Sequence, residues 1–147
     1  MDKYCEYINK LNWSNPKEIQ DEGVRFLTSS KNWDFSQCIS NSPKEVWCNL
    51  IKVIESRNRK DKTELIDELL FLLKDLTWPG ALKAYKILLT LDKDIMLEKL
   101  ELCLFKAYLE KDTVWIANLK MLIKQLGFNA NEFSSINLSE ILSIAEW

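Results

Sequence analysis

The sequence predicts an all-α protein, and three observations lead to that prediction. Apolar residues recur at intervals of three and four along much of the chain, as they do on one face of an α-helix. Only three Gly and three Pro occur in 147 residues, whereas all-β folds use many tight turns rich in both. Several Ser, Asn and Asp residues stand where they can cap a helix. We expect about six to eight helices in a single domain over residues 1–147.

Two helices are predicted at the N-terminus. Apolar side chains in residues 4–11 have helical spacing. Asn15 can cap the next helix and Pro16 can open it, which predicts a helix over residues 16–27. Gly23 within that helix indicates a close approach of its neighbour, since Gly has no side chain to hold the two helices apart.

Two polar segments are predicted to connect helices. Residues 28–42 are rich in Ser and Asn, which is typical of a loop. Residues 57–62 are charged and predict a solvated linker. Three apolar side chains are expected to anchor the first loop to the core, namely Trp33, Phe35 and Ile39.

Capping patterns place the remaining helix ends. Residues 42–45 and 61–64 both fit the capping box, in which a Ser or Asp is followed three residues later by Glu. Asp92 and Asp94 are expected to start the next helix, and Asp112 or Thr113 is expected to cap the last long one. Gly127 stands where a left-handed residue would end the last long helix.

A helical hairpin is predicted at the centre of the chain. Residues 65–73 and 81–89 are apolar helical runs joined by a turn over residues 75–80. Pro79 is expected in the first turn of the second helix, where its missing N–H would be unpaired in any case. The run 65–73 is apolar nearly all round, which is typical of an inner helix. The whole fold is therefore predicted to be a stack of such hairpins.

An internal repeat extends this prediction. Trp78 and Trp115 lie 37 residues apart, and each follows an Asp by three residues. That period is typical of helical-repeat arrays. We predict HEAT-like hairpins that form a right-handed α-α superhelix, with repeat units at about residues 61–91 and 94–127. Residues 128–147 are expected to cap the open end of the stack.

Residues 69–81, which read LLFLLKDLTWPGA, resemble the hallmark of a bacterial HEAT-like family of unknown function. Its members carry a Leu-rich helix followed by Asp-x-Asn-Trp-Pro and a small residue, and Thr77 stands here where Asn is usual. Some helical proteins of this kind are encoded beside secreted toxins. The resemblance therefore implies an immunity protein that blocks a toxin, with no catalytic residues to carry over.

The composition excludes several kinds of chemistry. The chain has no His, which excludes Ser-His-Asp and Cys-His catalysis and mixed Cys/His zinc sites. Its three Gly are too scattered for a phosphate-binding loop. The acidic residues of segment 92–101 either complement the helix dipole or bind a divalent cation. We expect no cofactor and no metal, since the first alternative is the simpler one.

The apolar runs, the cysteines and the net charge indicate where the protein is located and which partners it has. No apolar run reaches the roughly 18 residues that a membrane span needs. The four cysteines are expected to be reduced in a cytoplasmic protein. The alternative, two disulfides in a secreted domain, lacks a signal peptide. A net charge of −2 gives no reason to expect a nucleic acid or another polyanion as partner.

Six residues of the repeat are the candidates for binding. The two tryptophans pack into the neighbouring repeat, form an aromatic platform for a partner, or stack a nucleobase beside basic residues. The two lysines among the candidates are either solvated or form a basic ridge. The candidates are Trp78, Trp115, Asp75, Asp112, Lys83 and Lys120.

These observations predict a non-catalytic, protein-binding helical-repeat protein, whose concrete form is the immunity protein that binds a toxin domain. One alternative is a nucleic-acid-binding or base-repair enzyme on a HEAT-like scaffold. That alternative needs a positively charged groove for phosphates, and the negative net charge disfavours it. Another alternative is a scaffold subunit of a larger complex.

Overall fold

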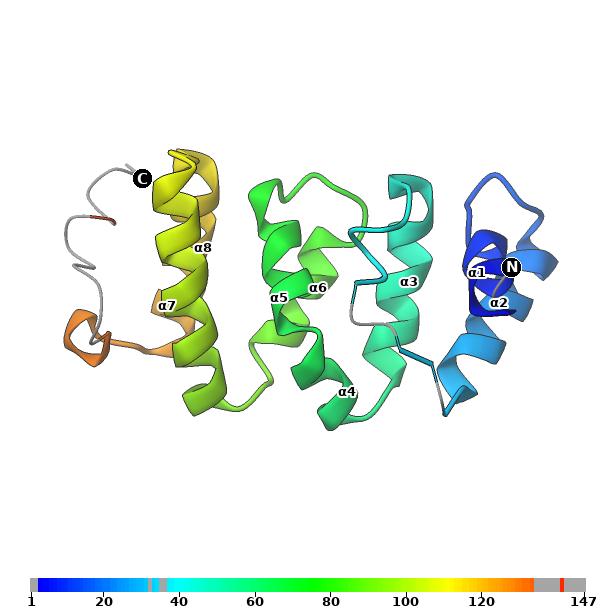
Figure 1. The fold of residues 1–147 in the computed structure, drawn as a ribbon, viewed down its shortest axis with the longest axis horizontal. Coiled ribbons are helices and arrows are strands. Elements are labelled where there is room, and N and C mark those ends of the chain that lie inside the picture. The colour runs from blue at the N-terminus through cyan, green and yellow to red at the C-terminus, as the bar shows by residue number, and fades with distance from the viewer. Residues whose placement is uncertain (1–2, 32, 35–36, 134–140, 142–147) are drawn as a thin grey trace.

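The computed structural model describes residues 3–31, 33–34, 37–133 and 141, and this part of the chain is all-helical (Figure 1). The α-helices are α1 (Lys3–Lys10), α2 (Lys17–Ser29), α3 (Lys44–Ser56), α4 (Arg59–Glu64), α5 (Ile66–Phe71), α6 (Ala81–Leu88), α7 (Lys93–Leu109) and α8 (Thr113–Leu126). Two 3-10 turns are η1 (Leu72–Lys74) and η2 (Ala130–Glu132). The predicted class, all-α with six to eight helices, is confirmed. The right-handed superhelix, the HEAT-like hairpins and the repeat units stay predictions.

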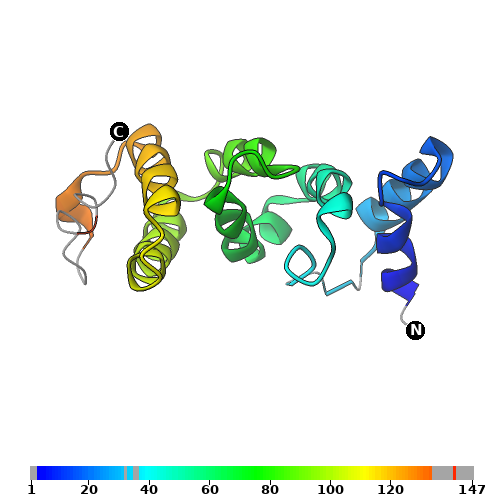
Figure 2. The ribbon, with the colours of Figure 1, turned by 90° about the horizontal axis from the view of Figure 1, so that it is seen from above.

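The helices follow one another along the long axis of the molecule, with α1 and α2 at one end and α7 and α8 toward the other (Figures 1 and 2). Helix α2 packs against α1 and α3, α6 against α3 and α5, and α7 against α5 and α8. One cluster of buried apolar residues extends from Leu11 to Ile141. Helices that pack together therefore cover part of each other's apolar surface.

The contact between α1 and α2 explains Gly23. A Cβ atom at this position would lie 2.9 Å from the carbonyl oxygen of Tyr7, so the predicted close approach is confirmed. The predicted role of Asn15 is wrong. Its Nδ2 donates to the carbonyl oxygens of Asn9 at 3.0 Å and Lys10 at 3.2 Å. Asn15 therefore caps the end of α1, and α2 begins without a side-chain cap.

Both predicted capping boxes are wrong in detail. The hydroxyl of Ser42 donates to the carbonyl oxygen of Cys38, and α3 begins after Pro43 without a side-chain cap. Helix α4 begins before Asp61, because the Oδ1 of Asn58 accepts from the backbone N–H of Asp61 at 2.8 Å. Ser42 therefore bonds to Cys38 and does not cap α3, and Asn58 takes the place of Asp61 as the cap of α4.

Three other helix ends match their predictions. Asp92 caps α7, since its Oδ1 accepts from the backbone N–H of Ile95 at 3.2 Å. Asp112 caps α8 by accepting from the backbone N–H of Trp115 at 3.0 Å. Gly127 ends α8 with φ of 81°, in the left-handed region that Gly tolerates.

The turn before α6 differs from its prediction. Pro79 does not lie in the first turn of the helix, because α6 begins at Ala81. The carbonyl of Trp78 accepts from the N–H of Ala81 at 3.1 Å, and Gly80 has φ of 82°. Pro followed by a left-handed Gly is the pattern of a type II turn. A Cβ on Gly80 would also lie 2.7 Å from Cγ1 of Ile51, so the turn packs tightly on α3.

The predicted solvated linker 57–62 is wrong at Arg57. The side chain of Arg57 is only 8% exposed. Its Nη1 donates to the carbonyl of Leu27 at 2.6 Å, and its Nη2 donates to the carbonyl of Ser30 at 2.7 Å. Its Nε donates to Asp61 at 2.8 Å. Arg57 therefore joins the end of α2 to the connection between α3 and α4.

The predicted anchors of the first loop are buried where the structure describes them. Trp33 is 7% exposed and Ile39 is fully buried, whereas Phe35 lies outside the described residues. At the C-terminal end, Phe133 and Ile141 belong to the core. The rest of the segment that is predicted to cap the stack, residues 134–140 and 142–147, lies outside the described residues.

Candidate protein-binding surface

Of the two predicted site residues at the start of α8, Trp115 belongs to the core and Asp112 caps the helix. Trp115 is 2% exposed, and its Nε1 donates to the carbonyl of Leu70 at 3.0 Å. One turn further on, Nδ2 of Asn118 donates to the carbonyl of Leu73 at 2.7 Å. Carbonyls at a helix end lack α-helical partners, so two side chains of α8 satisfy the end of α5 and η1. Asp112 supports this contact by capping α8.

A cation covers part of the Trp115 ring. The Nζ of Lys74 lies 4.6 Å from the centroid of that ring and 5.7 Å from the centroid of the Phe71 ring. The same Nζ forms an ion pair with Glu110 at 2.9 Å. Lys74 therefore fixes the junction of η1, α7 and α8 by cation–π and ionic contacts together.

The two predicted site residues in the turn before α6 are also engaged with their neighbours. The half-buried ring of Trp78 lies edge-on to the ring of Trp47, with 5.5 Å between centroids. The Nζ of Lys44 lies 4.8 Å from the centroid of Trp78. The Oδ1 of Asp75 accepts from the Oγ1 of Thr77 at 2.6 Å and from its N–H at 2.9 Å, and these bonds lower the pKa of Asp75.

The two predicted lysines lie on α6 and α8. The Nζ of Lys83 is 3.5 Å from Oε1 of Glu55 on α3, and both side chains are nearly half exposed. Exposed pairs of this kind contribute little to stability. Lys120 is half-buried on α8. The binding role of the six candidates stays a prediction.

One of the acidic residues of segment 92–101 caps the start of α7. Asp92 is its N-cap, as described above. In the part of the chain that the structure describes, no three Cys, Asp or Glu residues gather closely enough to hold a metal ion. Within the same residues, each helix is too short or too polar to cross a bilayer.

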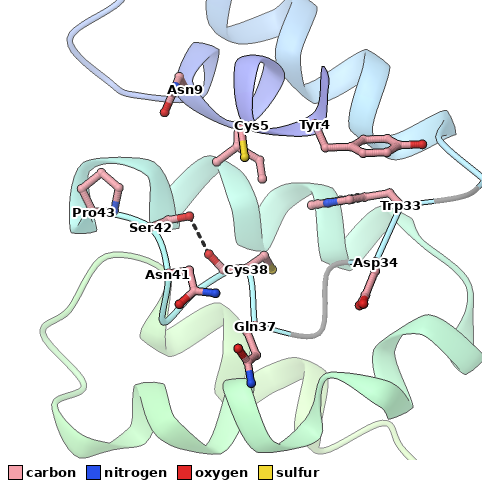
Figure 3. Close-up of a pocket in the computed structure, with 11 residues that line it drawn as sticks. Tyr4, Cys5, Asn9, Trp33, Asp34, Gln37, Cys38, Asn41, Ser42 and Pro43 are labelled. Atoms are coloured by element: carbon pink, nitrogen blue, oxygen red, sulfur yellow. Dashed lines mark hydrogen bonds between the residues drawn. The ribbon is translucent and has the colours of Figure 1, made fainter. Parts of the chain in front are cut away.

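A pocket of about 320 Å³ lies between α1 and the turn before α3 (Figure 3). The rings of Tyr4 and Trp33 stack on one side of it, with 6.2 Å between centroids. Cys5 enters from α1 and Cys38 from the turn (Figure 3). Burial raises the pKa of the Cys38 thiol to about 12, so this thiol is protonated and weakly nucleophilic at neutral pH. The pocket therefore provides space and polar edges, and its buried Cys38 thiol is not an activated nucleophile.

Helix α7 carries an exposed apolar surface that the sequence reasoning missed. Leu102, Phe105 and Leu109 are 61%, 47% and 64% exposed and lie on one face of the helix. Ile95, which is 38% exposed, extends this face toward the start of α7. We call these four residues the α7 strip. Figure 1 shows α7 in front of α8, its partner in the core.

The sequence contains a signal for this strip. Helix α7 is apolar on two opposite faces, and only one of them packs on α5 and α8. A helix that is apolar all round is usually buried on all sides, so its outer residues read as core in a sequence. The core face consists of Met96, Leu100, Leu104 and Ala107.

A groove of about 320 Å³ borders the α7 strip on the side of α5. Leu70 and Phe71 line it from α5, and Leu102 reaches it from the strip. Lys99 and Lys106 form its rim on α7. The surface thus has exposed apolar side chains beside a polar rim, which is the general arrangement of protein interfaces.

Comparison with known proteins identifies no relative: no family model matches the chain, and no curated protein or solved structure is similar to it. The fold and the surface define it as an all-helical protein with an exposed apolar strip on one helix.

Proposed function

We propose that this protein acts by binding another protein, without catalysing a reaction, and that the α7 strip is its contact surface. One observation carries the proposal. The strip places three side chains that are 47–64% exposed in one row on a single helix. Single exposed apolar residues are common, whereas a contiguous row of them is typical of an interaction site.

The strip offers enough apolar surface to contribute to binding. Full burial of a Leu or Phe side chain is worth about 1.5–3 kcal/mol, and here about half of that surface is still available on each residue. A few such side chains account for most of the affinity in many interfaces. Docking of a partner on one face of a helix, with anchors three, four and seven residues apart, is a common recognition mode.

The concrete form of the proposal is an immunity-type protein that binds a toxin domain. The resemblance of residues 69–81 to the bacterial HEAT-like family supports this form. An inhibitor of this kind needs a preformed surface and no reactive group, which agrees with a strip held on a helix whose other face is in the core.

The test uses the protein encoded by the neighbouring gene. Its toxicity is measured in cells with and without this chain, and its binding to the purified chain is measured by calorimetry. Leu102→Ser should weaken binding at least about tenfold, as expected for an anchor at the centre of an interface. Leu82→Ser is the matched control, because Leu82 is 62% exposed and lies on α6, away from the strip.

The outcomes separate the general proposal from its concrete form. A neighbour that is not toxic and does not bind this chain contradicts the immunity role. A neighbour that binds equally well to Leu102→Ser and Leu82→Ser contradicts the role of the strip. Loss of binding only in Leu102→Ser supports both.

A further inference from the structure

We infer that the α7 strip of one copy pairs with the α7 strip of a second copy, with the two α7 helices parallel. This inference rests on the proposed role of the strip as a contact surface, and it names the protein that covers the strip when no other partner is bound. Both copies contribute the same residues, so a twofold axis runs along the pair of helices.

The spacing of the strip is that of a coiled-coil seam. Ile95, Leu102 and Leu109 are seven residues apart, and Phe105 follows Leu102 by three. These are the a and d positions of a heptad. The seam from Ile95 to Leu109 is about 21 Å long, at about 1.5 Å per residue. Because the opposite face of α7 packs in the core, the helix is already formed and pairing requires no further helix ordering.

The charges beside the seam favour the parallel orientation. Asp94 and Glu101 occupy the g positions, and Lys99 and Lys106 occupy the e positions. In a parallel pair, each g residue lies beside the e residue five positions later in the other helix. Asp94 then meets Lys99 of the second copy, and Glu101 meets Lys106. In an antiparallel pair the e positions lie beside each other, and the lysines repel.

The lysines are accessible for these contacts. Lys106 is exposed, and the structure places it in no ion pair among the described residues. Lys99 forms a 3.1 Å ion pair with Asp67, whose side chain is 73% exposed. An exposed pair of this kind is weak, so Lys99 can exchange Asp67 for an acidic residue of the second copy.

One residue of the seam opposes the pairing. Glu98 occupies the d position between Ile95 and Leu102, so the carboxylates of the two copies face each other there. A charged residue in the seam lowers stability and restricts the pairing. The dimer should therefore be weak and reversible, which leaves the strip available to a tighter partner.

The experiment measures mass by sedimentation equilibrium up to about 500 μM, since small interfaces associate weakly. The wild type should show a concentration-dependent dimer. Glu98→Leu completes the apolar seam on an exposed position and should tighten the dimer at least about tenfold. The double variant Lys99→Glu, Lys106→Glu should weaken it, and the added pair Asp94→Lys, Glu101→Lys should restore it. Leu82→Ser is the control and should leave the dimer unchanged.

Each result decides between the possibilities. A monomer in both the wild type and Glu98→Leu overturns the pairing, and the proposed function still stands if the neighbouring protein binds in a Leu102-dependent way. A dimer that survives Leu102→Ser uses another surface and also overturns the inference. A dimer that persists after reversal of both lysines overturns the parallel orientation.

Discussion

Arg57 offers the sharpest test of how the stack is held together. Arg57→Ala removes four hydrogen bonds from a nearly buried guanidinium, three of them to carbonyls at the end of α2 and one to Asp61. Hydrogen bonds to charged groups contribute about 1.5–3 kcal/mol each, but water reaches part of the space left behind. Breaking a buried ionic contact by removing one partner typically costs about 3–5 kcal/mol, and we expect a loss in that range.

The assay is urea and thermal unfolding followed by far-UV circular dichroism. A loss of about 4 kcal/mol should lower Tm by roughly 10 °C in a chain of this size. Arg57→Lys should also lose stability, because one ammonium group cannot reproduce the fork of the guanidinium. The matched control is Arg59→Ala at an exposed position of α4, which should change stability by less than about 0.5 kcal/mol. Equal losses in Arg57→Ala and Arg59→Ala would refute the reasoning.

Three further predictions concern a turn, the thiols and pH. Gly80→Ala should destabilise the protein by more than the roughly 1–2 kcal/mol of a left-handed Ala, because its Cβ would lie 2.7 Å from Ile51. Gly127 has a similar φ and open space around it, so urea unfolding of Gly127→Ala should show only the free-energy cost of the left-handed backbone. Cys5 and Cys48 are exposed and should react with a disulfide reagent at about pH 8 in the folded protein. Cys38 is buried and burial raises its pKa to about 12, so it should react only on unfolding. Cys103 is half-buried and burial also raises its pKa to about 12, so it should react in the folded protein more slowly than Cys5 and Cys48. The pKa of Asp75 is lowered in the folded protein, so the charged form of Asp75 stabilises the protein above the ordinary pKa of Asp. This contribution is lost as pH falls. The difference in unfolding free energy between wild type and Asp75→Asn should therefore shrink below about pH 4.

Local signals in the sequence were sufficient for most helices and for some of their ends. The caps Asp92 and Asp112 accept from N–H groups two or three residues away, so their role can be predicted from the local sequence. The apolar spacing of α8 likewise predicts its buried face. Ser42 fails as a cap because Cys38, four residues before it, offers a carbonyl to the same hydroxyl.

The binding surface was harder to predict, because exposure depends on which elements pack against a helix. Leu100 and Leu102 are both Leu on α7, yet the first is fully buried and the second is 61% exposed. Trp115 shows the converse, since an aromatic residue suited to a binding platform is held in the core by a hydrogen bond to Leu70. Neither outcome follows from spacing alone, since both depend on where α5 ends relative to α7 and α8.

The stack is specified by hydrogen bonds at helix ends as well as by apolar contact. Side chains of later elements reach the terminal carbonyls of earlier helices, and these contacts are directional, so they fix the register between helices that apolar packing alone leaves loose. Asn15 and Asn49 reach the end of α1, Arg57 reaches the end of α2, and Trp115 and Asn118 reach the end of α5 and η1. The strip side chains of α7 take no part in these contacts within the described residues. Substitutions in the strip should therefore change binding while the fold is retained, which is the condition that makes the tests of its function decisive.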